Sequence, residues 1–158
     1  MPSYETTRHV PFSAAQMFAV VADVERYPQF LPLCESLTAR SREERDGETV
    51  LVATMSIGYG AIRESFTSRV TLRPARNEIA VAYLDGPFTH LDNRWRFRDV
   101  PGGSEVDFYI DYTFRSRMLG LVMGAVFDKA VRKYTLAFEE RARTIYGAAA
   151  VVAVASPR

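Results

Sequence analysis

Through its long central part, from Glu35 to Phe114, this chain alternates apolar and polar residues with a period of two. This pattern is typical of strands that bury one face and expose the other. Turn-forming pairs such as Asp46-Gly47 and Pro101-Gly102 interrupt it at short intervals, as expected for hairpins. We therefore predict six strands, at residues 35–44, 48–57, 61–73, 78–85, 90–99 and 104–114.

The chain before this central part favours a strand and then a helix. Residues 3–10 are strand-like. Ser13 and Gln16 form a capping-box sequence ahead of apolar residues at helical spacing, which predicts a helix at residues 14–24. The two prolines of residues 27–34 then allow at most one short turn of helix before an irregular apolar link.

The chain after the strands returns to a helical period. From Leu119 to Ile145 the apolar residues form one stripe at a spacing of 3.6, and charged residues fill the opposite side. This predicts an amphipathic helix of about 30 residues that ends at Gly147 as its C-cap. Residues 148–158 are expected to be a disordered tail.

These elements, in the order β-αα-β6-α, predict an α+β fold with a curved antiparallel sheet of about seven strands around the long C-terminal helix. The chain has 158 residues, 47% of them hydrophobic, which suits a single domain at residues 1–147. A curved sheet that holds one helix leaves a space between them, which is either a filled core or a cavity for a small ligand. The large side chains that line this space in the predicted pattern are Phe66, Tyr83, Trp95, Phe108, Tyr112, Met123 and Phe127.

The charge balance argues against a nucleic-acid partner. The net charge is +1, from 20 basic and 19 acidic residues, so no overall field attracts DNA, RNA or an anionic membrane. A row of arginines does occur within residues 94–98. The predicted hairpin places Arg98 opposite Glu105, and Arg96 then faces Asp107. We expect these cross-strand neighbours to neutralise the row.

The chain lacks the motifs of common catalytic and metal sites. Its single cysteine, Cys34, and its two distant histidines, His9 and His90, predict neither a metal site nor a disulfide framework. Glu64 and Asn93 fall on predicted apolar faces, where buried polar groups need partners. They could orient the polar head of a ligand, or bond to each other, to water or to the backbone. No catalytic residue is predicted.

The start of the last helix has two unusual features. Gly120 and Gly124 lie four residues apart, which predicts either close packing on the sheet or room for a ligand or for helix movement. Leu119 to Val126, with Met118 before it, is apolar all round, which suits contact with a membrane or a partner. We expect no leader in this sequence, and no apolar stretch is as long as a membrane span. We expect a cytoplasmic protein whose contact with the inner membrane would be peripheral and transient.

Three groups of residues together resemble one family. They are Tyr27-Pro28-x-Phe30-Leu31-Pro32-x-Cys34, then Asp85-Gly86-Pro87-Phe88 leading to Leu91-x-Asn93-x-Trp95-x-Phe97, and Phe127-x6-Tyr134 leading to Phe138-Glu139-x-Arg141-Ala142. As a set they are similar to the coenzyme Q-binding START-domain family, within the polyketide cyclase/dehydrase-like helix-grip superfamily. The ribosome-association toxin proteins are close relatives of that family. The resemblance covers residues 3–146.

The resemblance implies a helix-grip fold whose cavity holds ubiquinone, with no cofactor besides that ligand. It also implies a lipid chaperone for respiratory electron transport and quinone biosynthesis, without chemistry of its own. Two alternatives stay open: a ribosome-binding factor that blocks subunit association, and a polyketide cyclase or aromatase. The low net charge disfavours the first, and the lack of paired ionisable groups on the inner faces disfavours the second.

Carried over by position, the resemblance places residues 27–34 at one end of the cavity. A domain of this length has a radius of gyration of roughly 15 Å, so a long polyprenyl tail must fold back, protrude into a membrane or be shared between chains. The expected ligand-binding residues are Tyr27, Phe30, Leu31, Phe66, Tyr83, Asn93, Trp95, Phe97, Phe108, Tyr112, Met123 and Phe127.

Overall fold

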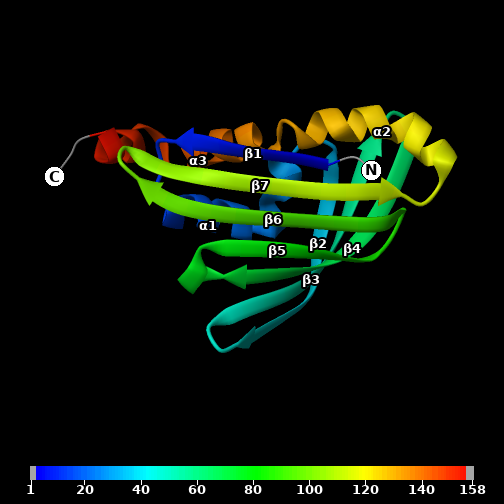
Figure 1. Cartoon of the computed structure of the whole chain (residues 1–158), viewed down its shortest axis with the longest axis horizontal. Coiled ribbons are helices and arrows are strands. Elements are labelled where there is room, and N and C mark those ends of the chain that lie inside the picture. The colour runs from blue at the N-terminus through cyan, green and yellow to red at the C-terminus, as the bar shows by residue number, and fades with distance from the viewer. Residues whose placement is uncertain (1–2, 156–158) are drawn as a thin grey trace.

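One antiparallel sheet of seven strands forms the frame of the molecule, in the order β1-β7-β6-β5-β4-β3-β2. The computed structural model describes residues 3–155, and the side chains of residues 3–147. Helices lie along one side of the sheet, and strands β2 to β4 turn away from the direction of β6 and β7, so that the sheet is strongly curved (Figure 1). The predicted α+β class is confirmed.

Each predicted strand is present, with ends that differ by at most two residues from the predicted ones. The alternation that predicted them is also the alternation of burial: along β7, every second side chain from Ser104 to Tyr112 is buried. One face of the sheet therefore packs on the core and the other meets solvent. The strands are β1 (Ser3–Val10), β2 (Cys34–Arg45), β3 (Glu48–Tyr59), β4 (Ile62–Arg73), β5 (Glu78–Asp85), β6 (Phe88–Val100) and β7 (Gly103–Phe114).

The N-terminal helix begins as its capping sequence predicts. The Ser13 hydroxyl accepts from the Gln16 amide at 3.1 Å, and the Gln16 side chain accepts from the Ser13 amide at 2.9 Å. The helix ends at Ala22, and a 3-10 helix that contains Pro28 follows it. The short helices are α1 (Ala14–Ala22), η1 (Val24–Gln29) and η2 (Pro74–Arg76).

The prediction of a single C-terminal helix is wrong in one respect, because the structure has two helices there. α2 (Arg117–Val131) ends and α3 (Tyr134–Ala155) begins on either side of Arg132 and Lys133. The two helices pack differently: α2 packs on β7, whereas α3 packs on α1 as well as on β7. The apolar stripe runs through the break with a helix-like spacing, so periodicity alone could not reveal it. The stripe is also shorter than predicted, because Ile145 at its end is 50% exposed.

Gly147 interrupts α3, as its predicted C-cap role requires. Its φ of 63° lies in the left-handed region that favours glycine. Helical backbone resumes after it and reaches Ala155. The expected disorder of residues 148–158 stays a prediction, and residues 156–158 lie outside the described part of the chain.

A glycine at the β5–β6 turn lets two strands approach closely. Gly86 has a φ of 143°, and a Cβ built on it would lie 2.5 Å from Phe66 Cβ. Nearby, the β4–β5 ladder passes from Thr67↔Asp85 to Ser68↔Tyr83, so the residue between these β5 partners has no counterpart on β4. Such a bulge bends a strand locally and re-aims the side chains beside it.

Candidate ligand cavity

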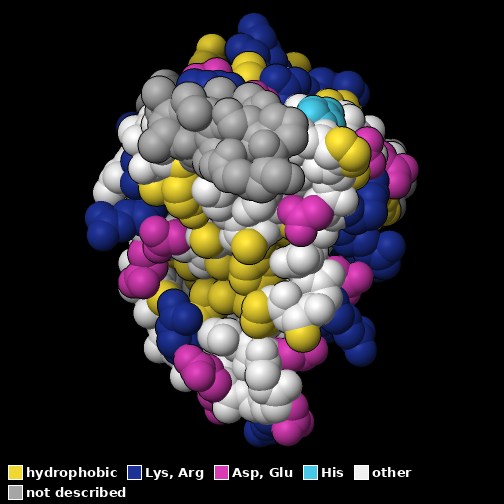
Figure 2. Space-filling view, turned by 90° about the vertical axis from the view of Figure 1, so that its left-hand side faces the viewer, with side chains coloured by type: hydrophobic (Ala, Val, Ile, Leu, Met, Phe, Trp, Pro, Cys, Tyr) yellow, Lys and Arg dark blue, Asp and Glu magenta, His cyan; other side chains and the backbone are white. Residues whose placement is uncertain are grey.

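A cavity of about 80 Å³ lies between the inner face of the sheet and helices η1, α2 and α3. Strands β2 to β7 contribute its walls, and no lining residue is aspartate, glutamate, lysine, arginine or histidine. Apolar side chains also reach the surface in a hollow in the middle of one face of the molecule, above its charged lower end (Figure 2). The cavity is lined by Val24, Tyr27, Leu31, Leu37, Ala53, Met55, Phe66, Ser68, Val70, Val81, Leu91, Asn93, Trp95, Ile110, Phe127, Tyr134 and Phe138.

Half of the residues predicted from the sequence line this cavity. They come from three separate parts of the chain, and the fold brings them together around one space. Their role in binding a ligand stays a prediction. The six are Tyr27 and Leu31 near η1, Phe66, Asn93 and Trp95 on the sheet, and Phe127 on α2.

The other six lie around the cavity and support its walls. Trp95 has Phe108 on one side, with ring centroids 4.6 Å apart, and stacks on Phe97 at 6.2 Å. Tyr112 packs edge-on against Phe127 at 4.8 Å. Three more predicted residues also lie outside the lining: Phe30 packs on Phe138 at 5.3 Å, the Tyr83 hydroxyl accepts from the Phe88 amide at 3.0 Å, and Met123 is buried.

Several lining residues were missed, although the sequence carried a signal for them. Tyr134 and Phe138 belong to the apolar stripe of the last helix and to the family motif. Ser68 lies on the predicted apolar face of β4, between Phe66 and Val70, but the polar residues singled out there and on β6 were Glu64 and Asn93. Glu64 is half-buried and does not line the cavity.

Most polar groups at the cavity wall have partners within the protein. The Asn93 amide donates to the Tyr109 carbonyl at 2.9 Å and accepts from the Trp95 indole at 3.1 Å. The Tyr27 hydroxyl donates to the Val21 carbonyl. Asn93 thus bonds to the backbone and to a neighbouring ring, and its satisfied amide holds the Trp95 ring in place.

Two hydroxyl groups at the wall have no such partner. The Ser68 hydroxyl oxygen is buried and makes no hydrogen bond with any described residue. Tyr134 faces the cavity from α3, and the structure shows no hydrogen bond from its hydroxyl within the described part of the chain. Burial and the nearby Cys34 raise the pKa of Tyr134 well above its ordinary value, so this hydroxyl keeps its proton.

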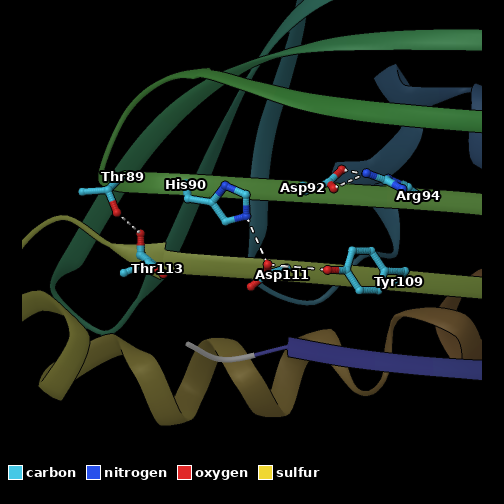
Figure 3. Close-up of polar contacts among 7 residues, drawn as sticks. All are labelled: Thr89, His90, Asp92, Arg94, Tyr109, Asp111 and Thr113. Carbon is cyan, nitrogen blue, oxygen red and sulfur yellow. Dashed lines mark hydrogen bonds and ion pairs between the residues drawn. The ribbon is translucent and has the colours of Figure 1, made fainter.

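A second polar cluster lies on the outer face of β6 and β7, away from the cavity (Figure 3). The His90 ring nitrogen Nε2 lies 3.2 Å from Asp111 Oδ2, and the Tyr109 hydroxyl lies 3.5 Å from the same oxygen. These side chains share one surface because strand register places Asp92 opposite Asp111. Within the described residues, no three histidine, cysteine, aspartate or glutamate side chains could hold a metal ion together.

The arginine row on this outer face is neutralised, as predicted. Arg98 lies opposite Glu105 in the ladder and contacts its carboxylate at 2.7 Å. The register also places Arg96 opposite Asp107, as predicted, although the direct contact with the Asp107 carboxylate comes from Arg98. The other two arginines pair with acids on or beside their own strand: Arg96 with Glu78 at 3.3 Å, and Arg94 with Asp92 at 2.8 Å.

An exposed apolar patch lies on the first turns of α2. Met118 is 73% exposed, Leu121 is 80% exposed and Val122 is 48% exposed. Of the two alternatives predicted for the glycines of this helix, Gly124 has room, since a Cβ there would have nothing within 4 Å, whereas a Cβ at Gly120 would make ordinary contact with Phe114. Within residues 3–155, no helix is both long and apolar enough to cross a membrane.

Comparison with known proteins places this chain in a family. Residues 10–139 match the model of the family described as polyketide cyclase / dehydrase and lipid transport. The chain belongs to this family. The 18 kDa protein CC1736 from Caulobacter crescentus has the same fold, with a TM-score of 0.76 and 31% identity over 94% of this chain and 100% of that one.

Two relatives in this family have names that point to different activities. The ribosome association toxin RatA of Escherichia coli K12 is 33% identical over 94% of this chain and 91% of its own length. The mitochondrial coenzyme Q-binding protein COQ10 homolog B of Xenopus laevis is 30% identical over 91% of this chain and 59% of its own length. Both names describe binding or association, while the family description also includes cyclases.

Proposed function

We propose that this protein is a carrier that binds a neutral polyprenyl quinone of the ubiquinone type in its cavity. The observation that carries the proposal is the cavity itself, which lies between sheet and helices and has no ionisable carboxylate, amine, guanidinium or imidazole in its lining. Mostly apolar cavities with a few polar groups are the usual sites for small apolar ligands. The similarity to a coenzyme Q-binding relative supports this choice of ligand class.

The volume of the cavity sets a condition on binding. An apolar cavity of about 150 Å³ is known to hold benzene, whereas this one measures about 80 Å³. A quinone ring therefore enters only if the walls move apart. The rings of Tyr27, Phe30 and Phe138 meet edge-to-face where η1 and α3 border the cavity. A rearrangement of these three rings would open the cavity towards the surface.

A carrier of such a ligand also needs contact with a membrane, and the patch on α2 suits this role. Residues 115–127 contain two arginines and no acidic residue. Exposed apolar side chains flanked by arginines match an anionic lipid surface. Phe127 of the same helix lines the cavity, so α2 would contact the membrane with its first turns and the ligand with its later part. We propose this contact as peripheral.

The proposal includes no chemical step. A cyclase or aromatase needs a group that accepts or donates a proton near neutral pH. The ionisable groups that line this cavity are the phenols of Tyr27 and Tyr134, and burial raises the pKa of both. They can donate hydrogen bonds but are poor bases. The relatives named for binding or association support the same choice.

Ribosome association is the second candidate, favoured by the similarity to RatA over almost the full length of both chains. Binding to ribosomal RNA depends on unpaired lysine and arginine side chains that contact phosphates. The arginine row of the outer sheet face is paired with acids, which makes that face a poor RNA surface. Co-sedimentation with purified ribosomal subunits at low and moderate salt tests this candidate directly.

The decisive experiment for the carrier function is extraction of freshly purified protein with organic solvent, followed by mass spectrometry. A stoichiometric polyprenyl quinone supports the proposal. The purified chain is then titrated with ubiquinone-2, because its single tryptophan, Trp95, lines the cavity and its fluorescence should be quenched by a bound quinone. An extract without quinone together with unquenched fluorescence overturns the proposal.

A further inference from the structure

Ser68 is the polar group of the cavity wall that most needs an explanation. Its side chain is 5% exposed, and its hydroxyl oxygen makes no hydrogen bond with any described residue. Folded proteins pair nearly all buried polar groups, because burial without a partner costs free energy. Phe66 and Val70, its neighbours on the same face of β4, are both apolar. Because Ser68 also lines the cavity, its hydroxyl is free to bond to a partner that comes from outside the chain.

The wall around Ser68 leaves room for that partner. Its neighbour across the β3–β4 ladder is Ala53, another small and buried lining residue. On the other side, the β4–β5 pairing is irregular next to Ser68, where Leu84 is the extra residue of β5. Two small side chains next to each other, beside a bulge, fill less of the space than the larger aliphatic and aromatic side chains around them.

Tyr134 supplies a second hydroxyl, from a different wall of the cavity. It lies at the start of α3, whereas Ser68 lies on the sheet, and both line the same space. Because the Tyr134 phenol keeps its proton, its O–H can donate a hydrogen bond to an acceptor oxygen of a ligand. Its oxygen can also accept a hydrogen bond. The other hydrogen-bonding side chains of the lining are engaged, since Asn93, Trp95 and Tyr27 bond within the protein; the Tyr112 hydroxyl, which also has no partner among the described residues, belongs to a residue outside the lining.

The chemistry of these two hydroxyls limits what they recognise. The lining has no cation that could neutralise a carboxylate or phosphate and no anion that could neutralise an amine. A charged head group would therefore be buried without compensation, at a large cost in free energy. A carbonyl oxygen is neutral and accepts hydrogen bonds, and a quinone ring has two such oxygens, which matches two hydroxyl donors on different walls.

We propose that the hydroxyls of Ser68 and Tyr134 recognise the carbonyl oxygens of an uncharged ring lipid and make the cavity prefer quinones over analogues of the same shape that lack these oxygens. This inference rests on the proposed carrier function and assigns its head-group specificity to two residues. Phe66, Trp95 and Phe127 contribute affinity for the ring without distinguishing its oxygens.

The test compares two probes that differ only at the ring oxygens. One is ubiquinone-2, and the other is its deoxygenated analogue, in which both ring carbonyl groups are replaced by C–H while the methoxy groups and the tail are kept. Calorimetric titration measures both affinities for the wild type, Ser68→Ala and Tyr134→Phe. Each substitution should weaken ubiquinone-2 binding about fivefold, the usual effect of one lost neutral hydrogen bond. Binding of the analogue should stay unchanged.

Ser104 provides a matched control for Ser68. Its hydroxyl is also buried and has no partner among the described residues, but it lies outside the cavity. Ser104→Ala should therefore bind both probes like the wild type. Ser68→Ala removes an unpaired buried hydroxyl, so its urea midpoint should equal or exceed that of the wild type. A loss of binding would then not reflect a loss of folding.

The outcomes separate this inference from the carrier function. A wild type that binds neither probe overturns both. A wild type that binds ubiquinone-2, with Ser68→Ala and Tyr134→Phe binding it equally well, overturns the inference and leaves the carrier function standing. If the variants lose both probes to the same extent, the hydroxyls act only on the shape of the cavity, and the inference is again wrong.

Discussion

Phe138 of α3 packs edge-to-face against Trp95 of β6, with ring centroids 5.0 Å apart and planes at 81°. This contact joins the C-terminal helix to the sheet across the cavity. Tyr27 and Phe30 pack on the same phenyl ring, at 5.2 and 5.3 Å. One side chain therefore holds together three parts of the chain and also keeps the cavity small.

Removal of this ring should enlarge the cavity enough to admit a small aromatic molecule. We expect Phe138→Ala to lower the free energy of unfolding by about 3–5 kcal/mol, the usual cost of a large cavity. Benzene should then raise the unfolding midpoint of the variant and leave that of the wild type unchanged, because a ligand stabilises only the state that binds it. Urea unfolding with and without benzene measures both effects.

Phe97→Ala is the control for this prediction. Phe97 is buried and stacks on the same tryptophan, but it does not line the cavity. It should lose stability without gaining a response to benzene. A Phe138→Ala protein that ignores benzene would show that its walls collapse into the space left by the ring, which would contradict this prediction.

Cys34 should be a slow thiol at neutral pH. Burial, with a smaller effect of Glu35, raises the pKa of this thiol from 9.0 to about 11. A pKa higher by two units gives about a hundredfold less thiolate at pH 8 than an ordinary cysteine has. The thiol is also buried, which limits access of a reagent. Labelling with a thiol reagent should therefore be at least that much slower in the folded protein than in urea. Equal rates would contradict the burial of this residue.

The same shift predicts a loss of stability at high pH. The folded state holds the Cys34 proton more tightly than the unfolded state, so the associated stability is complete below pH 9 and is lost as the pH rises towards 11. Tyr112, whose pKa burial raises to about 12, should add a further loss above pH 10. Urea midpoints between pH 8 and pH 10 test the first step, which Cys34→Ser should remove. A slope that persists in this variant would assign the step to another group.

The strands could be predicted because their evidence is local. Each has one buried face, so hydrophobic alternation marks it, and the hairpin register that pairs Arg98 with Glu105 follows from a short turn. The split between α2 and α3 could not be predicted in this way, because Val131 and Tyr134 continue one stripe at a spacing of three. Tertiary packing, which the local pattern does not contain, decides where the helix breaks.

The cavity was predictable in composition but not in detail. Aromatic residues on inner faces marked its walls, yet alternation cannot tell a residue that lines a space from one that packs behind it, as Trp95 and Phe108 show. Asn93 looked like a free polar group until the structure placed the Tyr109 carbonyl beside it. Ser68 looked ordinary because a serine in a strand is common. Only the lack of a partner sets it apart.

The ion pairs of Glu139 should stabilise the packing of β1 on α3. Its buried carboxylate is contacted by Arg8 of β1 and by Arg143 one turn along α3, at 3.2 Å. We expect the double variant Arg8→Met, Arg143→Met to lose about 2–3 kcal/mol of unfolding free energy, because it leaves the buried Glu139 carboxylate without a partner. The loss should be smaller than for a fully buried pair, because both arginines are partly exposed. Glu139→Gln should lose less, as no charge is then buried. Urea unfolding of the wild type, the double variant and Glu139→Gln measures both losses of stability. A larger loss in Glu139→Gln than in the double variant would contradict this prediction.

The exposed patch of α2 should bind anionic membranes. Met118 and Leu121 are the most exposed large apolar side chains of the described structure, and they follow the exposed Arg117. We expect the protein to co-sediment with vesicles that contain phosphatidylglycerol, and less so as salt rises, because the arginines are screened. Met118→Ser with Leu121→Ser should weaken this binding by at least tenfold, since each buried leucine-sized side chain contributes about 1.5–3 kcal/mol.

Leu136→Ser, at a 43% exposed position on α3, is the matched control and should bind like the wild type. Equal losses in control and patch variants would show that general hydrophobicity, and not the α2 patch, causes the binding.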